Sequence, residues 1–142
     1  MARVTIYHSK VDAETERVAR RVIDRVLDEI QAEAKRITAV GPYTSGDLAL
    51  SIKRGPTVVR GQVITGDVGS DLPYAKFVHD GTRKHFIFPR GPWRLRFYWR
   101  RLGRDVAFWS VYHPGQKAKK FLTGPAARVS ARYGWIVFTR KI

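Results

Sequence analysis

An apolar stripe near the start of the chain constrains the fold more than any other feature of the sequence. Its members recur mostly at every third or fourth position over residues 19–37, so they lie on one face of a helix. The stripe consists of Ala19, Ile23, Val26, Leu27, Ile30, Ala34 and Ile37. Ser9 or Asp12 can cap the start of this helix. We therefore predict one long N-terminal helix that packs through a single face.

Strand signals dominate the middle of the chain. The runs Thr57–Val59 and Gln62–Thr65 flank Arg60-Gly61, a pair that suits a tight hairpin, and His85–Phe88 is a further predicted strand. Short helices are predicted near 72–80 and 124–132. This order of elements predicts an α+β fold, with the long helix packed on a small antiparallel β-sheet or half-barrel.

Length and composition favour one domain. The 142 residues, 44% of them hydrophobic, suffice for one core, so we predict a single domain over residues 1–142. Residues 133–142 contain a strand-like run, which we interpret as a C-terminal arm that pairs with the sheet edge of a neighbouring subunit. No apolar run reaches the roughly 20 residues of a membrane helix, and no secretory signal is recognisable. We expect a soluble protein with no membrane contact.

The segment 71–82 has the signals of a short helix. Asp71 can cap it, Pro73 suits its first turn, and Gly81 can end it. Three apolar side chains, Tyr74, Phe77 and Val78, then share one face. We predict that these three residues anchor the helix to the core, and that His79 and Asp80 face a neighbour.

The segment from Leu95 to Tyr112 has the pattern of a β-hairpin with Leu102-Gly103 at the turn. Apolar and basic side chains alternate on its first strand, so each kind takes its own face. The apolar face has Leu95, Phe97 and Trp99, and we expect Ala107, Trp109 and Val111 of the return strand to join it. The opposite face is a basic ribbon of Arg94, Arg96, Tyr98 and Arg100.

Charge is distributed unevenly along the chain. The net charge is +15, and residues 83–142 hold fifteen Lys/Arg against one acidic residue, Asp105. Such a field attracts polyanions and acidic protein surfaces. The sequence has no cysteine, which excludes disulfides, thiolate metal sites and cysteine nucleophiles.

Motifs for catalysis are missing from the sequence. The four histidines, at positions 8, 79, 85 and 113, match no compact metal-ligand spacing, and no phosphate-binding loop or nucleophile elbow occurs. We therefore predict no catalytic residues, no cofactor and no metal.

Two alternatives stay open. One is a small metal-independent ribonuclease that uses Arg96, Tyr98, Arg100 and His113. The other is a basic nucleic-acid-binding protein in which Trp93, Tyr98, Trp99 and Trp109 stack on bases.

Three local patterns occur in an order that resembles the neck family of long-tailed bacteriophages, also called head–tail joining or tail-completion proteins. The first has Thr44, Gly46 and Leu48, followed by Ser51-Ile52. The second has Tyr74, Ala75, His79, Gly81 and Thr82. The third has Pro114, Gly115, Phe121 and Leu122, followed by Ala126-Ala127.

The resemblance implies a structural virion protein that performs no reaction. Neck proteins assemble as rings of six or twelve copies between the DNA-filled head and the tail, so the expected partners are further copies and the adjoining portal-side and tail-side proteins. The expected location is the head–tail interface of the virion, after synthesis in the host cytoplasm. A lumen lined by the whole basic ribbon would hold DNA and oppose its passage. We therefore expect most of the ribbon to meet acidic protein surfaces, and a minority of it to contact the packaged DNA end.

Overall fold

The predicted long helix is present as α1, Ala13–Ala39, and it buries the predicted stripe. The computed structural model describes residues 2–7, 13–40, 46–61, 63–134 and 137–140, and it confirms the α+β class. The candidate caps Ser9 and Asp12 lie outside the described residues. Along α1 the fully buried positions are Ile23, Val26, Leu27, Ile30, Ala34 and Thr38, while Ala19 and Ile37 are partly buried against the same core.

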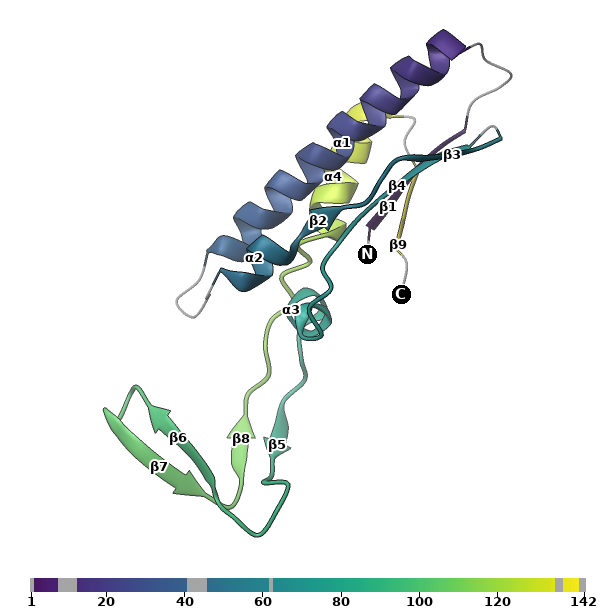
Figure 1. The fold of residues 1–142 in the computed structure, drawn as a ribbon. Helices are drawn as coiled ribbons and strands as arrows, with labels where there is room; N and C mark the ends of the chain where they lie inside the picture. Colours follow the sequence, from purple (N-terminus) through teal and green to yellow (C-terminus); the bar gives the residue numbers. More distant parts are fainter. Residues whose placement is uncertain (1, 8–12, 41–45, 62, 135–136, 141–142) are drawn as a thin grey trace.

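The helix packs on a five-stranded antiparallel sheet whose central strand is β4, Val63–Gly69 (Figure 1). On one side β4 pairs with β2, Lys53–Arg54, and with β3, Val58–Arg60. The turn between β3 and β4 contains Gly61 with φ of 60°, as expected for the predicted tight hairpin. On its other side β4 pairs with β1, Ala2–Tyr7.

The last strand, β9, Val137–Arg140, pairs with β1 and forms an edge of this sheet. It lies in the range 133–142 that we expected to reach a neighbouring subunit. In the structure this strand instead completes the sheet of its own chain, because β1 offers it an unpaired edge.

Two further helices complete the core. The predicted helix near 124–132 is α4, Thr123–Tyr133, which lies beside α1, and the short α2, Asp47–Ser51, follows α1. A Cβ atom added to Gly66 of β4 would collide with the side chain of Leu27, so helix and strand approach each other closely there. The core side chains outside α1 are Leu48, Ile52, Ile64, Val68, Ala75, Phe121, Leu122, Ala126 and Val129.

The outer face of α1 is held by ion pairs with other parts of the same chain. Arg54 of β2 contacts Asp24 at 2.6 Å and Asp28 at 3.0 Å. The hydrogen bond from Thr57 and the nearby Arg54 guanidinium hold the pKa of Asp24 below its ordinary value. Glu29 and Glu33 also pair with Arg132 and Arg128 of α4. The pairs Glu16–Arg20 and Glu33–Arg36 lie within α1 itself.

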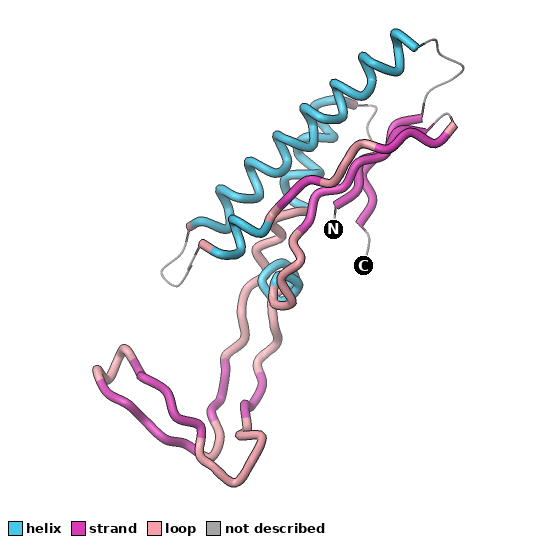
Figure 2. The backbone as a smooth tube through the Cα atoms, in the orientation of Figure 1, coloured by secondary structure: helices cyan, strands magenta, loops and turns pink. Residues whose placement is uncertain are grey.

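Below the core the chain forms a projecting arm, residues 82–116. It leaves from the third helix, α3, Ala75–Asp80, and has two parts (Figures 1 and 2). The stalk pairs β5, His85–Ile87, with β8, Val111–His113. Beyond it, the hairpin pairs β6, Leu95–Trp99, with β7, Arg104–Phe108. No side chain between residues 80 and 120, all of which the structure describes, is buried.

The predicted 95–112 hairpin is present, but its return strand is shorter and its register differs. Leu95 pairs with Phe108 and Phe97 with Val106, so Val106 and Phe108 join the apolar face. The predicted partners Ala107, Trp109 and Val111 do not: Ala107 pairs with Arg96, and Val111 belongs to β8 in the stalk. The predicted return strand is divided because its two halves pair with different strands.

Candidate functional site

The base of the arm begins with α3, whose buried face differs from the predicted one. Ala75 and His79 are buried, and Val78 packs against the core. Tyr74 and Phe77 are exposed, at 43% and 57%, so the prediction that they anchor the helix is wrong. The small Ala75 lets α3 approach the core closely, which leaves the larger aromatic side chains outside. Asp71 does not cap this helix, which begins after Tyr74 without a side-chain cap.

His79 ties α3 to the start of α4. Its Nε2 accepts hydrogen bonds from the backbone N–H of Thr123 at 3.3 Å and from the Thr123 hydroxyl at 3.2 Å. The other ring nitrogen, Nδ1, therefore carries the hydrogen and donates a hydrogen bond to the Asp80 carboxylate at 2.7 Å. The N–H of Thr123 is one of the helix-end donors that α4 itself cannot satisfy. His79 thus serves the core, which corrects the expectation that it faces a neighbour.

The second and third sequence motifs meet at this base. The backbone groups of Thr82 and Gln116 exchange two hydrogen bonds, at 2.9 and 3.0 Å. Gly81 and Gly115 flank this bridge with φ of 74° and 85°. A Cβ atom on Gly81 would lie 2.5 Å from the carbonyl oxygen of Gln116, and one on Gly115 would collide with the carbonyl oxygen of Thr82. Only glycine allows the two strands to approach this closely.

The remaining motif residues are structural where the structure describes them. Gly46 has φ of 84° before α2, and its carbonyl accepts the N–H of Leu50. Leu48 and Leu122 belong to the core, and the ring of Phe121 lies against His79. Pro114 lies next to Gly115 at the base of the arm, whereas Thr44 lies outside the described residues. The second and third motifs therefore hold the arm to the core, and the first shapes α2.

The hairpin presents an aromatic face. Its rings form one cluster, with centroid distances of 6.1 Å between Phe97 and Trp99, 6.3 Å between Phe97 and Phe108, and 5.9 Å between Trp99 and Phe108. All three side chains are more than one-third exposed. A cluster of this kind lowers its free energy by packing against another surface.

The stalk carries a second aromatic cluster that the sequence reasoning did not single out. Phe86 lies 5.2 Å from Tyr112 across the ladder and 6.2 Å from Phe88, and all three are exposed. The signal was present in the alternation of Phe86 and Phe88 around Ile87, which places the two phenyl rings on one face of a strand.

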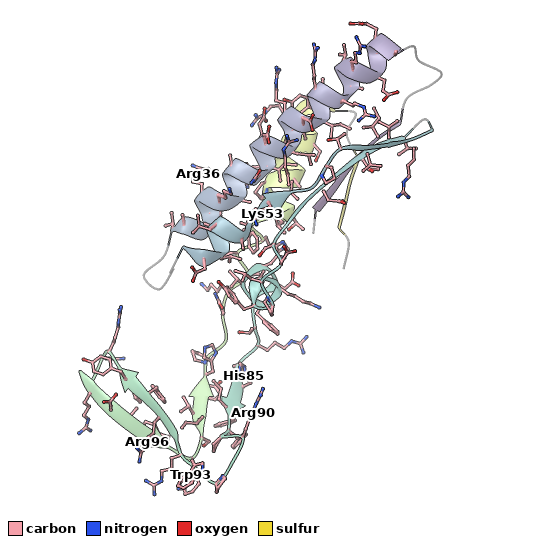
Figure 3. All side chains as sticks on the ribbon, viewed as in Figure 1. Arg36, Lys53, His85, Arg90, Trp93 and Arg96 are labelled. Atoms are coloured by element: carbon pink, nitrogen blue, oxygen red, sulfur yellow. The ribbon has the colours of Figure 1, made fainter. Side chains whose placement is uncertain are left out.

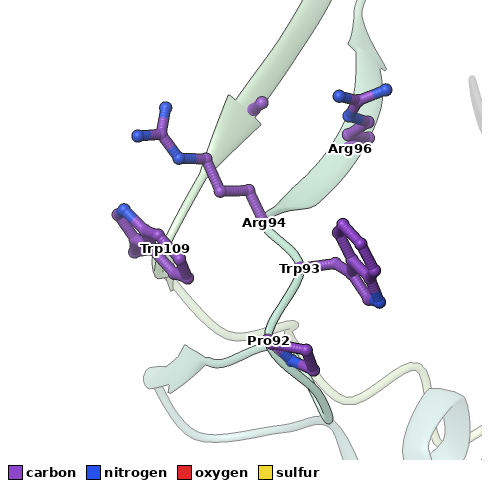
Figure 4. A pocket seen from close by; sticks show the side chains of 6 residues that line it. Pro92, Trp93, Arg94, Arg96 and Trp109 are labelled. Atoms are coloured by element: carbon purple, nitrogen blue, oxygen red, sulfur yellow. The ribbon is translucent and has the colours of Figure 1, made fainter.

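The opposite face of the hairpin contains the basic ribbon, of which Arg96 is labelled in Figure 3. Arg90 and Trp93, which precede the hairpin, also project from the arm there. Arg96 pairs across the ladder with Ala107, and Tyr98 with Asp105. The guanidinium of Arg94 lies over the indole of Trp109, 5.2 Å from its centroid. A hollow of about 650 Å³ is lined by Pro92, Trp93, Arg94, Arg96, Ala107 and Trp109 (Figure 4). Arg100 follows β6 in the turn of the hairpin.

The candidate ribonuclease residues are divided between the two parts of the arm. Arg96 and Tyr98 lie in the hairpin, whereas His113 lies in the stalk. The ring centroids of His113 and His85 lie 5.2 Å apart. The Nδ1 atom of His113 accepts a hydrogen bond from the N–H of Gly115 at 3.1 Å. Within the described ranges, no three His, Asp or Glu side chains gather as metal ligands would.

A small core that holds out an arm without buried side chains is typical of a protein that packs against other subunits. A family model described as "Bacteriophage HK97-gp10, putative tail-component" matches residues 2–81, more than half of the chain. The chain belongs to this family of bacteriophage tail components. The matched residues include the long helix, the strands β1 to β4 and α3, and they end at Gly81, where the arm begins.

No curated protein and no solved structure matches the chain. None of the helices that the structure describes is long and apolar enough to cross a membrane.

Proposed function

We propose that this protein is a structural virion component that forms a ring in the neck, where it joins the DNA-filled head to the tail. It acts by binding other proteins and catalyses no reaction. Family membership supports a structural role in the phage tail. The observation that carries the neck-ring proposal is the arm, which exposes two aromatic clusters and buries no side chain.

Two of the exposed apolar surfaces that the structure describes differ from each other, which suits a ring. One is the aromatic face of the hairpin with Phe97, Trp99 and Phe108, and the other is the outer face of α3 with Tyr74 and Phe77. Contacts between two different patches are heterologous and close into rings when the rotation between copies allows it. In our proposal the hairpin of each copy packs on α3 of the next copy.

Charge also argues that the ring has partners of another kind. Each chain carries +15, so neighbouring copies repel one another unless anionic groups lie near them. We propose that the adjoining portal-side and tail-side proteins supply acidic surfaces to part of this exposed basic surface.

Electron microscopy of the purified protein and of virions tests the proposal. Rings are expected in the purified sample, and an antibody or a fused tag should mark the neck of the virion. The double variant Phe97→Ser with Trp99→Ser should abolish the rings and leave a folded monomer. A matched control, Val18→Ser, removes an exposed apolar side chain from α1 and should leave the rings intact. A wild-type protein that is monomeric at all concentrations, or a label that lies away from the neck, would contradict the proposal.

A further inference from the structure

The arm is strongly basic. Residues 82–116 contain eight Lys/Arg and one acidic residue, a net charge of +7. Among the described residues, Arg94 and Arg96 form no ion pair, while every acidic residue of α1 from Glu16 onward is paired within the chain. The α1 carboxylates of a second copy, from Glu16 onward, are therefore already engaged. The arm fits an anionic partner of a different kind.

Two tryptophans flank the same arginines. Trp93 is 80% exposed and Trp109 58% exposed, although indoles are large apolar groups that normally contact other atoms. They lie on opposite sides of the segment that carries Arg94 (Figure 4). Ala107 pairs across the ladder with Arg96 and has a small side chain, so the hollow that both tryptophans line stays open. We call Trp93, Arg94, Arg96 and Trp109 the cradle.

We propose that the cradle binds single-stranded nucleic acid. Arg94 and Arg96 contact phosphates, and the exposed faces of Trp93 and Trp109 stack on bases. Guanidinium groups beside aromatic rings are the combination that holds unpaired strands, since every base has a face to stack on. A duplex would use only the arginines, because its bases are already stacked inside the helix. The exposed indoles therefore favour an unpaired strand.

This inference goes beyond the proposed ring and does not depend on it. The cradle lies at the opposite face of β6 from Phe97 and Trp99, which we assign to contacts between copies. Arg94 and Arg96 also lie outside residues 2–81, which match the family. The binding test uses the purified full chain, whatever its oligomeric state, so its failure would leave the ring proposal standing.

Fluorescence anisotropy with a labelled single-stranded oligothymidine tests the arginines. The cradle variant is the double substitution Arg94→Ala and Arg96→Ala. Its control, the double substitution Arg17→Ala and Arg21→Ala, removes the same charge from α1. The cradle variant should bind at least about tenfold more weakly, and the slope of log affinity against log salt should fall by about 1.4, as expected for two lost phosphate contacts. The control should bind nearly as well as the wild type. Equal losses in both variants would show that only net charge matters and would overturn the proposal.

Tryptophan substitutions test stacking. Trp93→Ala should weaken binding about tenfold and reduce the quenching of intrinsic fluorescence by the strand. Leu50→Ala, which removes an exposed apolar side chain from α2, should leave the affinity unchanged. Duplex DNA of the same length should bind more weakly than the single strand. The proposal would be overturned by an unchanged affinity for Trp93→Ala or by equal binding of the duplex. Equally strong competition by polyglutamate would also overturn it and would indicate an acidic protein partner. Circular dichroism of each variant verifies that it is folded.

Discussion

The imidazole of His79 meets the phenyl ring of Phe121 edge to face, with the ring centroids 5.3 Å apart and the planes at 76°. This contact joins the helix that precedes the arm to the segment that follows it. His79 is 6% exposed and also accepts the helix-end N–H of Thr123. One side chain therefore supplies packing and a hydrogen-bond acceptor at the point where both strands of the arm enter the core.

His79→Ala should destabilise the protein by about 2–4 kcal/mol, because it leaves a cavity beside Phe121 and removes the acceptor for Thr123. Urea unfolding followed by circular dichroism measures this difference. Phe77→Ala on the exposed face of the same helix is the control and should change the free energy of unfolding by less than about 0.5 kcal/mol. Equal effects of the two substitutions would show that the buried face of α3 is assigned wrongly.

Gly81→Ala and Gly115→Ala should each cost about 2 kcal/mol or more, because both residues have positive φ and an added Cβ meets the backbone of the opposite strand. Gly103 is a matched control, since its φ is 63° but nothing lies within 4 Å of an added Cβ. Gly103→Ala should therefore cost only about 1 kcal/mol, the backbone strain alone. Thermal unfolding measures all three variants, and similar losses at the three positions would argue against close packing at the base.

Acid should weaken the contact between α1 and β2. The hydrogen bond from Thr57 and the Arg54 guanidinium lower the pKa of Asp24, so the carboxylate stabilises the fold above its unfolded pKa. This contribution is lost as the pH falls through the lowered pKa of the folded state. Because 41% of the Asp24 side chain is exposed, the loss should be small, on the order of 0.5 kcal/mol. Urea unfolding between about pH 3 and pH 7 should show a shallower pH dependence for Asp24→Asn than for the wild type.

Thr57→Val should raise the pKa of Asp24 towards its ordinary value, because it removes the largest cause of the shift. NMR titration of the Asp24 carboxyl carbon measures the change directly. An unchanged pKa in this variant would show that the nearby arginines, Arg54 and Arg20, are responsible instead.

The arm should be dispensable for folding. Residues 86–112 can be replaced by Asn-Gly, because His85 and His113 lie directly opposite each other and a two-residue turn joins such a pair. The shortened chain should retain the unfolding free energy of the full chain within about 1 kcal/mol, since no side chain of the arm is buried. It should also fail to form rings. An unfolded shortened chain would show that the core needs the arm.

Local sequence patterns predicted the elements of the fold well. The apolar period located α1, and Gly61 and Gly81 marked a hairpin turn and a helix end that the structure has. Such features depend on near neighbours in the chain, so their signals are contained in short windows.

The orientation of α3 could not be predicted in the same way. Tyr74, Phe77 and Val78 have the spacing of a helix face, but so do Ala75, Val78 and His79. Hydrophobicity favours the first set, whereas the structure buries the second, because the Ala75 face meets Phe121 from a distant segment. Aromatic residues that stay on the surface are indistinguishable in sequence from aromatic residues that pack in the core.

The division of residues 106–112 between two strands also depends on contacts with distant segments of the chain. These residues have the pattern of one strand, but β7 pairs with the preceding β6 and β8 pairs with the earlier β5. Pairing over such a distance leaves no local signal. The register shift moved Val106 and Phe108 to the aromatic face, and the cradle around Trp109 became visible only in three dimensions.

The lack of buried side chains in the arm has an evolutionary consequence. In our proposal, substitutions there change the contacts that the protein makes with others, while the free energy of folding depends on the core and on the few residues at the base. Selection can therefore alter partner choice without loss of stability, provided that Gly81, Gly115 and His79 are retained. Related proteins should accordingly differ most between residues 84 and 113, in both length and chemistry, and share the base from which their arms extend.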